Sequence, residues 1–153
     1  MMSLCCKVLK ALQGKTLVTA ESCTGGGIGS ALTAIPGSSE VYKGGVICYT
    51  NWVKNQVLGV DQALLDAYGA VSAPVAEAMA DGVRKRLQAD VAVSVTGLAG
   101  PGIDDFGNAV GTVYIGYDSA KGSTVREFHF SGDRESVRRQ AVQASLELIL
   151  EMQ

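Results

Sequence analysis

A short β-branched run at residues 15–20 stops at Glu21-Ser22-Cys23-Thr24, and three consecutive glycines follow. Such a run predicts a strand, whereas residues 26–35, which are small and apolar without alternation, predict a helix. Amides at a helix start point outward with the positive end of the dipole, so they can hold a phosphate or a developing oxyanion. Ser22 is therefore a candidate nucleophile. The alternative is that Ser22 or Thr24 only caps the helix.

The rest of the chain alternates between helical and strand patterns. Helices are predicted over 2–13, 26–34, 52–68 (two short helices separated by Gly59), 72–87 and 134–152. Further strands are predicted over 45–50, 90–95, 110–118 and 123–130, the last two joined by a short turn and hence antiparallel. This order predicts an α/β fold: a three-layer α/β/α sandwich with a mixed, mainly parallel sheet and one antiparallel strand.

Size and charge limit the possible partners. We expect a single domain over residues 1–153, because this length suffices for one core. The formal charge of −2 gives no electrostatic reason to expect binding of nucleic acid or an anionic membrane. No apolar run approaches the ~18 to 20 residues that span a bilayer, and the N-terminus lacks a secretory pattern. We expect a soluble cytoplasmic protein.

Cysteine spacing suggests no metal site. The four cysteines, at positions 5, 6, 23 and 48, lack metal-ligand spacing and do not resemble a disulfide framework. Reduced thiols are the simplest interpretation.

Three polar or glycine-rich segments are predicted at the carboxyl ends of parallel strands, where α/β sheets place their sites. They are residues 21–26, 49–54 and 96–102. We therefore expect any chemistry where these segments meet.

A serine nucleophile needs a base, and the single histidine is poorly placed to be one. His129 alternates with Phe128 and Phe130 in a predicted strand, so a Ser-His-Asp triad would require it to leave that strand. A lysine can serve if burial lowers its pKa, and a tyrosine hydroxyl can relay the proton. Lys54 and Tyr49 are the best such pair, although spacing alone favours a solvated lysine and a packed aromatic residue.

Six ordered motifs resemble the CinA C-terminal domain family, which includes competence/damage-inducible proteins and stand-alone nicotinamide-nucleotide amidases. They are residues 20–26 (AESCTGG), 49–54 (YTNWVK), 68–72 (YGAVS), 96–101 (TGLAGP), 110–113 (VGTV) and 131–138 (SGDRESVR). The resemblance extends from the first strand to the last helix. It implies a three-layer fold and an amidohydrolase that converts nicotinamide mononucleotide and water into nicotinate mononucleotide and ammonia without a metal or organic cofactor.

The resemblance also implies roles for individual residues. Ser22 falls on the nucleophile, Lys54 on the general base and Tyr49 on an assisting hydroxyl. The residues expected to shape the pocket or bind the nucleotide are Thr24, Gly25, Gly26, Thr96, Gly100, Arg134 and Arg138. The last two could instead lie on an exposed helix face with Glu135 as partner.

The chain departs from the family pattern at two places that commonly carry a cation. Gly44 stands where an arginine is common, next to Lys43, and Asn108-Ala109 replaces a Lys-Pro pair. Loss of one phosphate contact typically costs ~1.5 to 3 kcal/mol in binding without affecting the Ser/Lys chemistry. The alternative function is therefore a non-catalytic or altered-specificity relative that binds a nucleotide or another amide.

Partners are expected to be few. The resemblance implies a small nucleotide substrate and no nucleic acid. A symmetric homodimer is the default expectation for a small metabolic enzyme.

Overall fold

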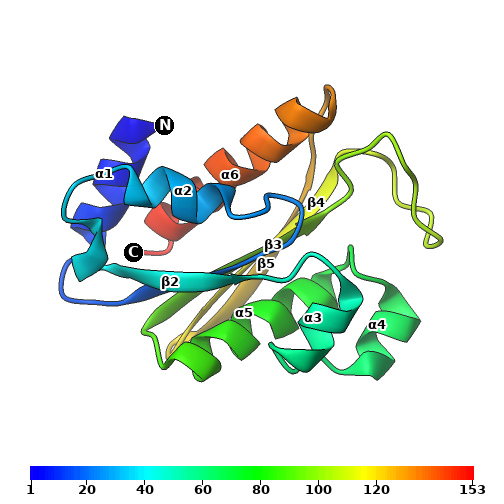
Figure 1. The fold of residues 1–153 in the computed structure, drawn as a ribbon, viewed down its shortest axis with the longest axis horizontal. Helices are drawn as coiled ribbons and strands as arrows, with labels where there is room; N and C mark the ends of the chain where they lie inside the picture. The colour runs from blue at the N-terminus through cyan, green and yellow to red at the C-terminus, as the bar shows by residue number, and fades with distance from the viewer.

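The computed structural model describes residues 1–153 as a five-stranded sheet between two helical layers (Figure 1). The helices are α1 (Met2–Ala11), α2 (Gly27–Thr33), α3 (Asn51–Gln56), α4 (Gln62–Tyr68), α5 (Ala73–Leu87) and α6 (Arg134–Glu151), with a short 3-10 helix η1 (Ser38–Glu40). The strands are β1 (Leu17–Glu21), β2 (Tyr42–Ile47), β3 (Val91–Gly97), β4 (Thr112–Ser119) and β5 (Gly122–His129).

The sheet has the order β2-β1-β3-β4-β5. β1 pairs in parallel with β2 and with β3, and β4 pairs antiparallel with β3 and β5. Only β4 therefore runs against the other four strands. This confirms the predicted mixed sheet with one antiparallel strand, and it brings the carboxyl ends of β1, β2 and β3 to one edge.

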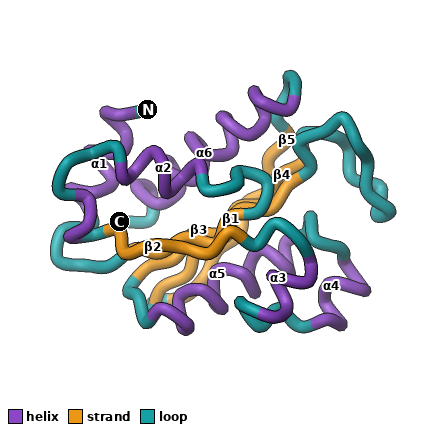
Figure 2. The backbone as a smooth tube through the Cα atoms, viewed as in Figure 1, coloured by secondary structure: helices purple, strands orange, loops and turns teal.

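Alternating side chains divide the core into two parts. Val91, Val93 and Val95 of β3 join the larger cluster beneath α1, α2 and α6, whereas Ala92 joins the smaller cluster beneath α5. Successive strand residues point to opposite faces, so one apolar strand serves both layers. Figure 2 shows these helical layers above and below the sheet, with the long loop between β3 and β4 extending beyond it.

The second strand lies three residues earlier than predicted. Residues 45–50 were expected to be extended, but β2 ends at Ile47 and Thr50 already caps α3 by accepting a hydrogen bond from Val53 N at 3.4 Å. Competition between strand propensity and a helix cap explains the difference, because Thr favours both. The three intervening residues form the turn that leads to Lys54.

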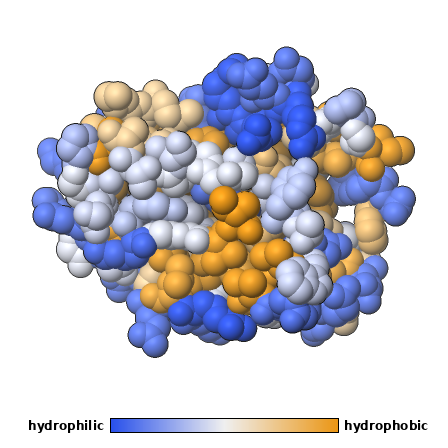
Figure 3. Space-filling view, viewed as in Figure 1, coloured by the Kyte–Doolittle hydropathy of each residue, from blue (hydrophilic) through white to orange (hydrophobic).

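The face drawn in Figure 3 carries an apolar patch along the unpaired β2 edge. Ile47 of β2 is 58% exposed.

No helix combines the length and apolar character required to cross a membrane.

Candidate active site

Ser22 is the first residue after β1, in the turn that leads to α2. Its amide donates to Val95 O at 2.9 Å, which extends the β1-β3 ladder by one residue. The turn then reverses through Gly25 and Gly26, both with positive φ, before α2 begins. Glycine adopts this backbone conformation at little cost. The sheet thus fixes Ser22 at its carboxyl edge.

Lys54 brings its amine to Ser22 from α3. Its side chain is 1% exposed, and Nζ lies 2.9 Å from Ser22 Oγ and 2.8 Å from Cys48 O. The Tyr49 carbonyl oxygen lies 3.5 Å from Nζ. Burial lowers the pKa of Lys54 from its usual value, because a charged amine loses hydration when it leaves water.

The surroundings of Lys54 suit both protonation states. A neutral amine has two N–H donors and one lone pair, whereas an ammonium has three donors. Two carbonyl oxygens and the Ser22 hydroxyl surround Nζ. A neutral Lys54 can therefore donate to both carbonyls and accept the Ser22 proton, which is the arrangement a general base requires.

Glu21 has a structural part in the site that the sequence did not suggest. Its carboxylate, 2% exposed, accepts hydrogen bonds from Thr24 Oγ1 at 2.6 Å, Ile28 N at 2.8 Å and Gly29 N at 3.0 Å. The first-turn amides of α2 thus bind the carboxylate of Glu21. They are therefore not free to bind a phosphate or an oxyanion, the role that the sequence suggests for them. Only the fold shows this, because the contacts reach seven and eight residues along the chain.

A cavity of about 340 Å³ opens beside Ser22 and Lys54. The three predicted segments all contribute to it: Ser22 and Cys23, Tyr49 and Lys54, and residues of 96–102 including Thr96 and Gly100. Ala70 and Val71, from the motif at residues 68–72, and Ile103 also line the cavity, although the sequence did not assign them to the site.

Arg134, at the start of α6, lines the same cavity. Its guanidinium donates to Gly100 O at 2.7 Å and to Tyr49 Oη at 3.1 Å. The Tyr49 side chain is 59% exposed. Its hydroxyl therefore contacts Arg134, and its contact with Lys54 is made through the backbone carbonyl.

The other predicted binding residues, Thr24, Gly25 and Gly26 of the turn and Arg138 of α6, do not line the cavity. Arg138 donates from Nε to Cys23 O at 3.0 Å and from Nη2 to Thr24 O at 3.3 Å. The Thr24 hydroxyl is held by Glu21. Neither Arg134 nor Arg138 forms an ion pair, with Glu135 or any other carboxylate.

The two departures from the family pattern place no cation in the cavity. The Lys43 amine donates to Ser39 O at 2.6 Å. The Asn108 side-chain amide donates to Asp104 Oδ2 at 2.6 Å and to Val71 O at 3.1 Å. Arg134 and Lys54 are the basic side chains of the lining.

Histidine and cysteine side chains offer no alternative to Ser22 and Lys54 in the cavity. His129 contacts Glu127 Oε2 at 2.5 Å on β5, and it does not line the cavity. Burial raises the pKa of the Cys23 and Cys48 thiols to about 11. No group of three His, Cys, Asp or Glu side chains has an arrangement suited to a metal ion.

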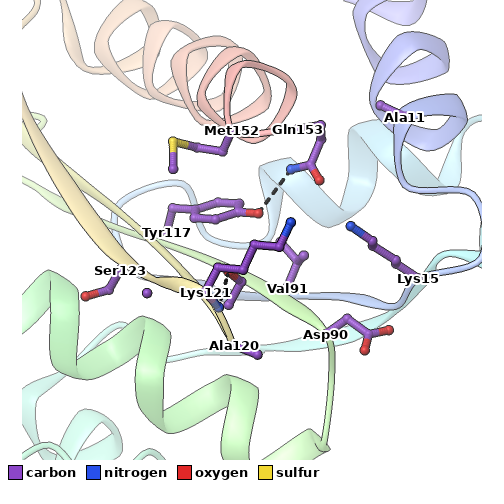
Figure 4. Close-up of a pocket in the computed structure, with 12 residues that line it drawn as sticks. Ala11, Lys15, Asp90, Val91, Tyr117, Ala120, Lys121, Ser123, Met152 and Gln153 are labelled. Carbon is purple, nitrogen blue, oxygen red and sulfur yellow. Dashed lines mark hydrogen bonds between the residues drawn. The ribbon is translucent and has the colours of Figure 1, made fainter.

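A larger cavity, of about 580 Å³, lies at the opposite edge of the sheet. Figure 4 shows Lys15 and Lys121 directed into it, with Tyr117 receiving a hydrogen bond from Gln153. It contains no nucleophile paired with a base, so size alone does not identify the reactive site.

Comparisons with known proteins point to one family. Residues 2–153 match the model of the CinA C-terminal domain. A CinA-like protein from Acidobacterium capsulatum is 44% identical over 90% of this chain, and one from Parasynechococcus marenigrum is 50% identical over 92%. The chain covers 33% of each of these two relatives, so it spans about a third of their length.

Solved structures agree along the whole chain. A CinA superfamily protein from Klebsiella pneumoniae has a TM-score of 0.95 at 33% identity, with 98% of this chain and 95% of that chain covered. The competence/damage inducible protein CihA from Agrobacterium tumefaciens has a TM-score of 0.95 at 37% identity, with 99% and 94% covered.

Proposed function

Because the chain belongs to the CinA C-terminal domain family, we propose that it is a Ser/Lys amidohydrolase that deamidates nicotinamide mononucleotide. The observation that carries the proposal is the 2.9 Å contact between Lys54 Nζ and Ser22 Oγ, made by a lysine that is 1% exposed. A buried amine in hydrogen-bond contact with a hydroxyl meets the geometric and electrostatic requirements of nucleophile activation.

The reaction begins when Lys54 accepts the Ser22 proton and Ser22 Oγ bonds to the carboxamide carbon. The carbonyl oxygen becomes an oxyanion, which backbone amides of the glycine turns stabilise. The C–N bond then breaks, and Lys54 returns the proton to the departing ammonia. Water cleaves the resulting ester with Lys54 again as base, which releases the carboxylate and restores Ser22.

The cavity supplies complementary surfaces for such a substrate. Val71, Leu98 and Ile103 provide an apolar wall for a heteroaromatic ring. Arg134 uses two of its N–H groups on Gly100 O and Tyr49 Oη. Its guanidinium has five in all, so it retains donors and an unpaired charge for a phosphate.

The side chains of Lys43 and Asn108 form hydrogen bonds within the protein and do not line the cavity, which favours a second candidate substrate. Because neither places a cation in the cavity, a less charged amide is the alternative substrate for the same catalytic pair. A binding role without catalysis is the other alternative.

Ammonia release tests these possibilities. Incubation of the protein with nicotinamide mononucleotide should yield ammonia and nicotinate mononucleotide, and Ser22→Ala and Lys54→Met should each reduce kcat by about 10³-fold or more, as for other nucleophile-base units. Lys43→Met is the matched control, because Lys43 is an exposed lysine whose amine contacts only Ser39 O. Turnover of other amides alone would identify the altered-specificity alternative. Binding without turnover of any amide would contradict the enzymatic proposal.

A further inference from the structure

Two backbone amides beside the nucleophile have no acceptor in any other residue. The Cys23 and Thr24 amides form no hydrogen bond with another residue, whereas the neighbouring Gly25 amide donates to Ser22 O at 3.1 Å. The first-turn amides of Ile28 and Gly29 are occupied by Glu21. The free donors next to Ser22 are thus in the turn, not in the helix.

Arg138 holds the peptide groups to which these amides belong. In a planar trans peptide the N–H points opposite to the preceding C=O. The Nε contact with Cys23 O therefore fixes the direction of the Thr24 N–H. The Nη2 contact with Thr24 O fixes the Gly25 N–H, whose bond to Ser22 O in turn fixes the Cys23 N–H.

The turn provides room for this contact. A Cβ at Gly25 would lie 3.3 Å from Arg138 Nη2, with φ at +57°. A side chain at this position would therefore be strained and would press on the guanidinium. The cationic group also lies close enough to Cys23 for its charge to act on that residue, since it lowers the pKa of the Cys23 thiol against the larger effect of burial.

We propose that Arg138 is a positioning residue whose guanidinium, through the Thr24 carbonyl and the Gly25–Ser22 hydrogen bond, sets the direction of the amide of Cys23, which lines the cavity, so that this amide stabilises the oxyanion formed when Ser22 attacks a carbonyl. This rests on the proposed function only in taking Ser22 as the nucleophile. It gives Arg138 a role other than the phosphate contact suggested by the family resemblance.

A small uncharged fluorophosphonate tests the proposal without a nucleotide substrate. Ser22 Oγ forms a bond to phosphorus, the P–F bond breaks, fluoride leaves and Lys54 takes the hydroxyl proton, so the adduct can be followed by intact mass. Loss of one oxyanion donor costs about 10²- to 10³-fold. A donor that is retained but misdirected should cost less than a donor that is removed, so Arg138→Ala is expected to label about 10- to 100-fold more slowly than the wild type.

Three comparisons separate positioning from other roles. Arg138→Lys keeps the charge but cannot contact the Cys23 and Thr24 carbonyls at the same time, so it should restore only part of the labelling rate. The same variant replaces Arg138→Ala in this test if Arg138→Ala fails to fold. Arg139→Ala, at the adjacent exposed arginine of α6, should label within about twofold of the wild-type rate, as surface changes usually have small effects. The pH midpoint of labelling, which reports Lys54, should not move in Arg138→Lys.

Three results would overturn the role proposed for Arg138, and a fourth would separate it from the proposed function. Wild-type labelling rates in both Arg138 variants, or a loss explained entirely by a shifted pH midpoint, contradict a role through the Cys23 amide. A rise in KM for nicotinamide mononucleotide with unchanged labelling assigns Arg138 to the phosphate instead. No labelling of the wild-type protein also rules out the proposed oxyanion site. Labelling without deamidation defeats the proposed function and leaves this inference supported.

Discussion

A lysine that is 1% exposed and has no carboxylate partner is costly to keep charged, because a buried ammonium loses its hydration. Two carbonyl oxygens and the Ser22 hydroxyl partly offset this loss for Lys54. Burial therefore lowers the pKa of the amine from its usual value. Burial thus favours the neutral amine of Lys54, which is the form that can accept the Ser22 proton.

The lowered pKa predicts a specific dependence of stability on pH. Between the folded pKa of Lys54 and ~10.4, its usual value, the unfolded chain holds a proton that the folded chain has released. The free energy of unfolding therefore rises with pH through this window for this group. Urea titrations of the wild type and Lys54→Met at several pH values should show a difference that grows in favour of the wild type as pH rises toward ~10.4.

Two buried thiols titrate together with Lys54. Burial raises the pKa of Cys23 and Cys48 to about 11, so their contribution to the free energy of unfolding falls as pH rises. The Lys54 charge lowers both thiol pKa values, so the wild-type and Lys54→Met side chains are compared in a Cys23→Ala, Cys48→Ala background. Lys43→Met, which removes an exposed lysine, should give a constant difference. A constant difference for Lys54→Met as well would show that Lys54 has an ordinary pKa.

Among the elements, α3 has the most demanding task, because six residues must present Lys54 to a turn in another segment. Its cap, Thr50, is the last residue of the three-residue turn after β2. Beyond the end of α3, the chain packs on α5, where Leu58 meets Gly82. A Cβ at Gly82 would lie 2.2 Å from the Leu58 carbonyl oxygen. This glycine therefore permits the close approach that places α3.

Gly82→Ala is accordingly expected to destabilise the protein. In an open helix, Gly-to-Ala gains about 1 kcal/mol, but here the added methyl group meets backbone, and overpacking typically costs about 1–3 kcal/mol. Urea unfolding should show a net loss, with reduced activity as α3 is displaced. Glu77→Gly, at an exposed position of the same helix, should lose only about 1 kcal/mol from propensity. A Gly82→Ala protein more stable than the wild type would contradict the close-approach argument.

At the scale of the whole molecule, the chemistry-bearing turns follow from strand direction. The sequence predicted that 21–26, 49–54 and 96–102 would meet, because alternating helices and strands predict parallel strands with a common carboxyl edge. The structure confirms the sheet and its one reversed strand. These three segments could be placed from the sequence because each follows a strand, and the strand pattern and strand direction together determine where a strand ends.

Other features depended on contacts that sequence spacing does not encode. Glu21 reaches the start of α2, and Arg138 reaches the turn from more than a hundred residues away. The orientation of the Tyr49 hydroxyl toward Arg134 likewise depends on where α6 begins. The roles of Ser22, Lys54 and Tyr49 are proposals, and so is a homodimer.

The covalent intermediate is the central claim of this account, and its capture tests it most directly. A rapid quench of the protein with nicotinamide mononucleotide, followed by peptide mass analysis, should show an acyl adduct of the nucleotide on the peptide that contains Ser22. Ser22→Ala should show neither adduct nor ammonia. Ammonia release by Ser22→Ala at the wild-type rate, or an adduct on a different residue, would contradict the Ser22/Lys54 mechanism.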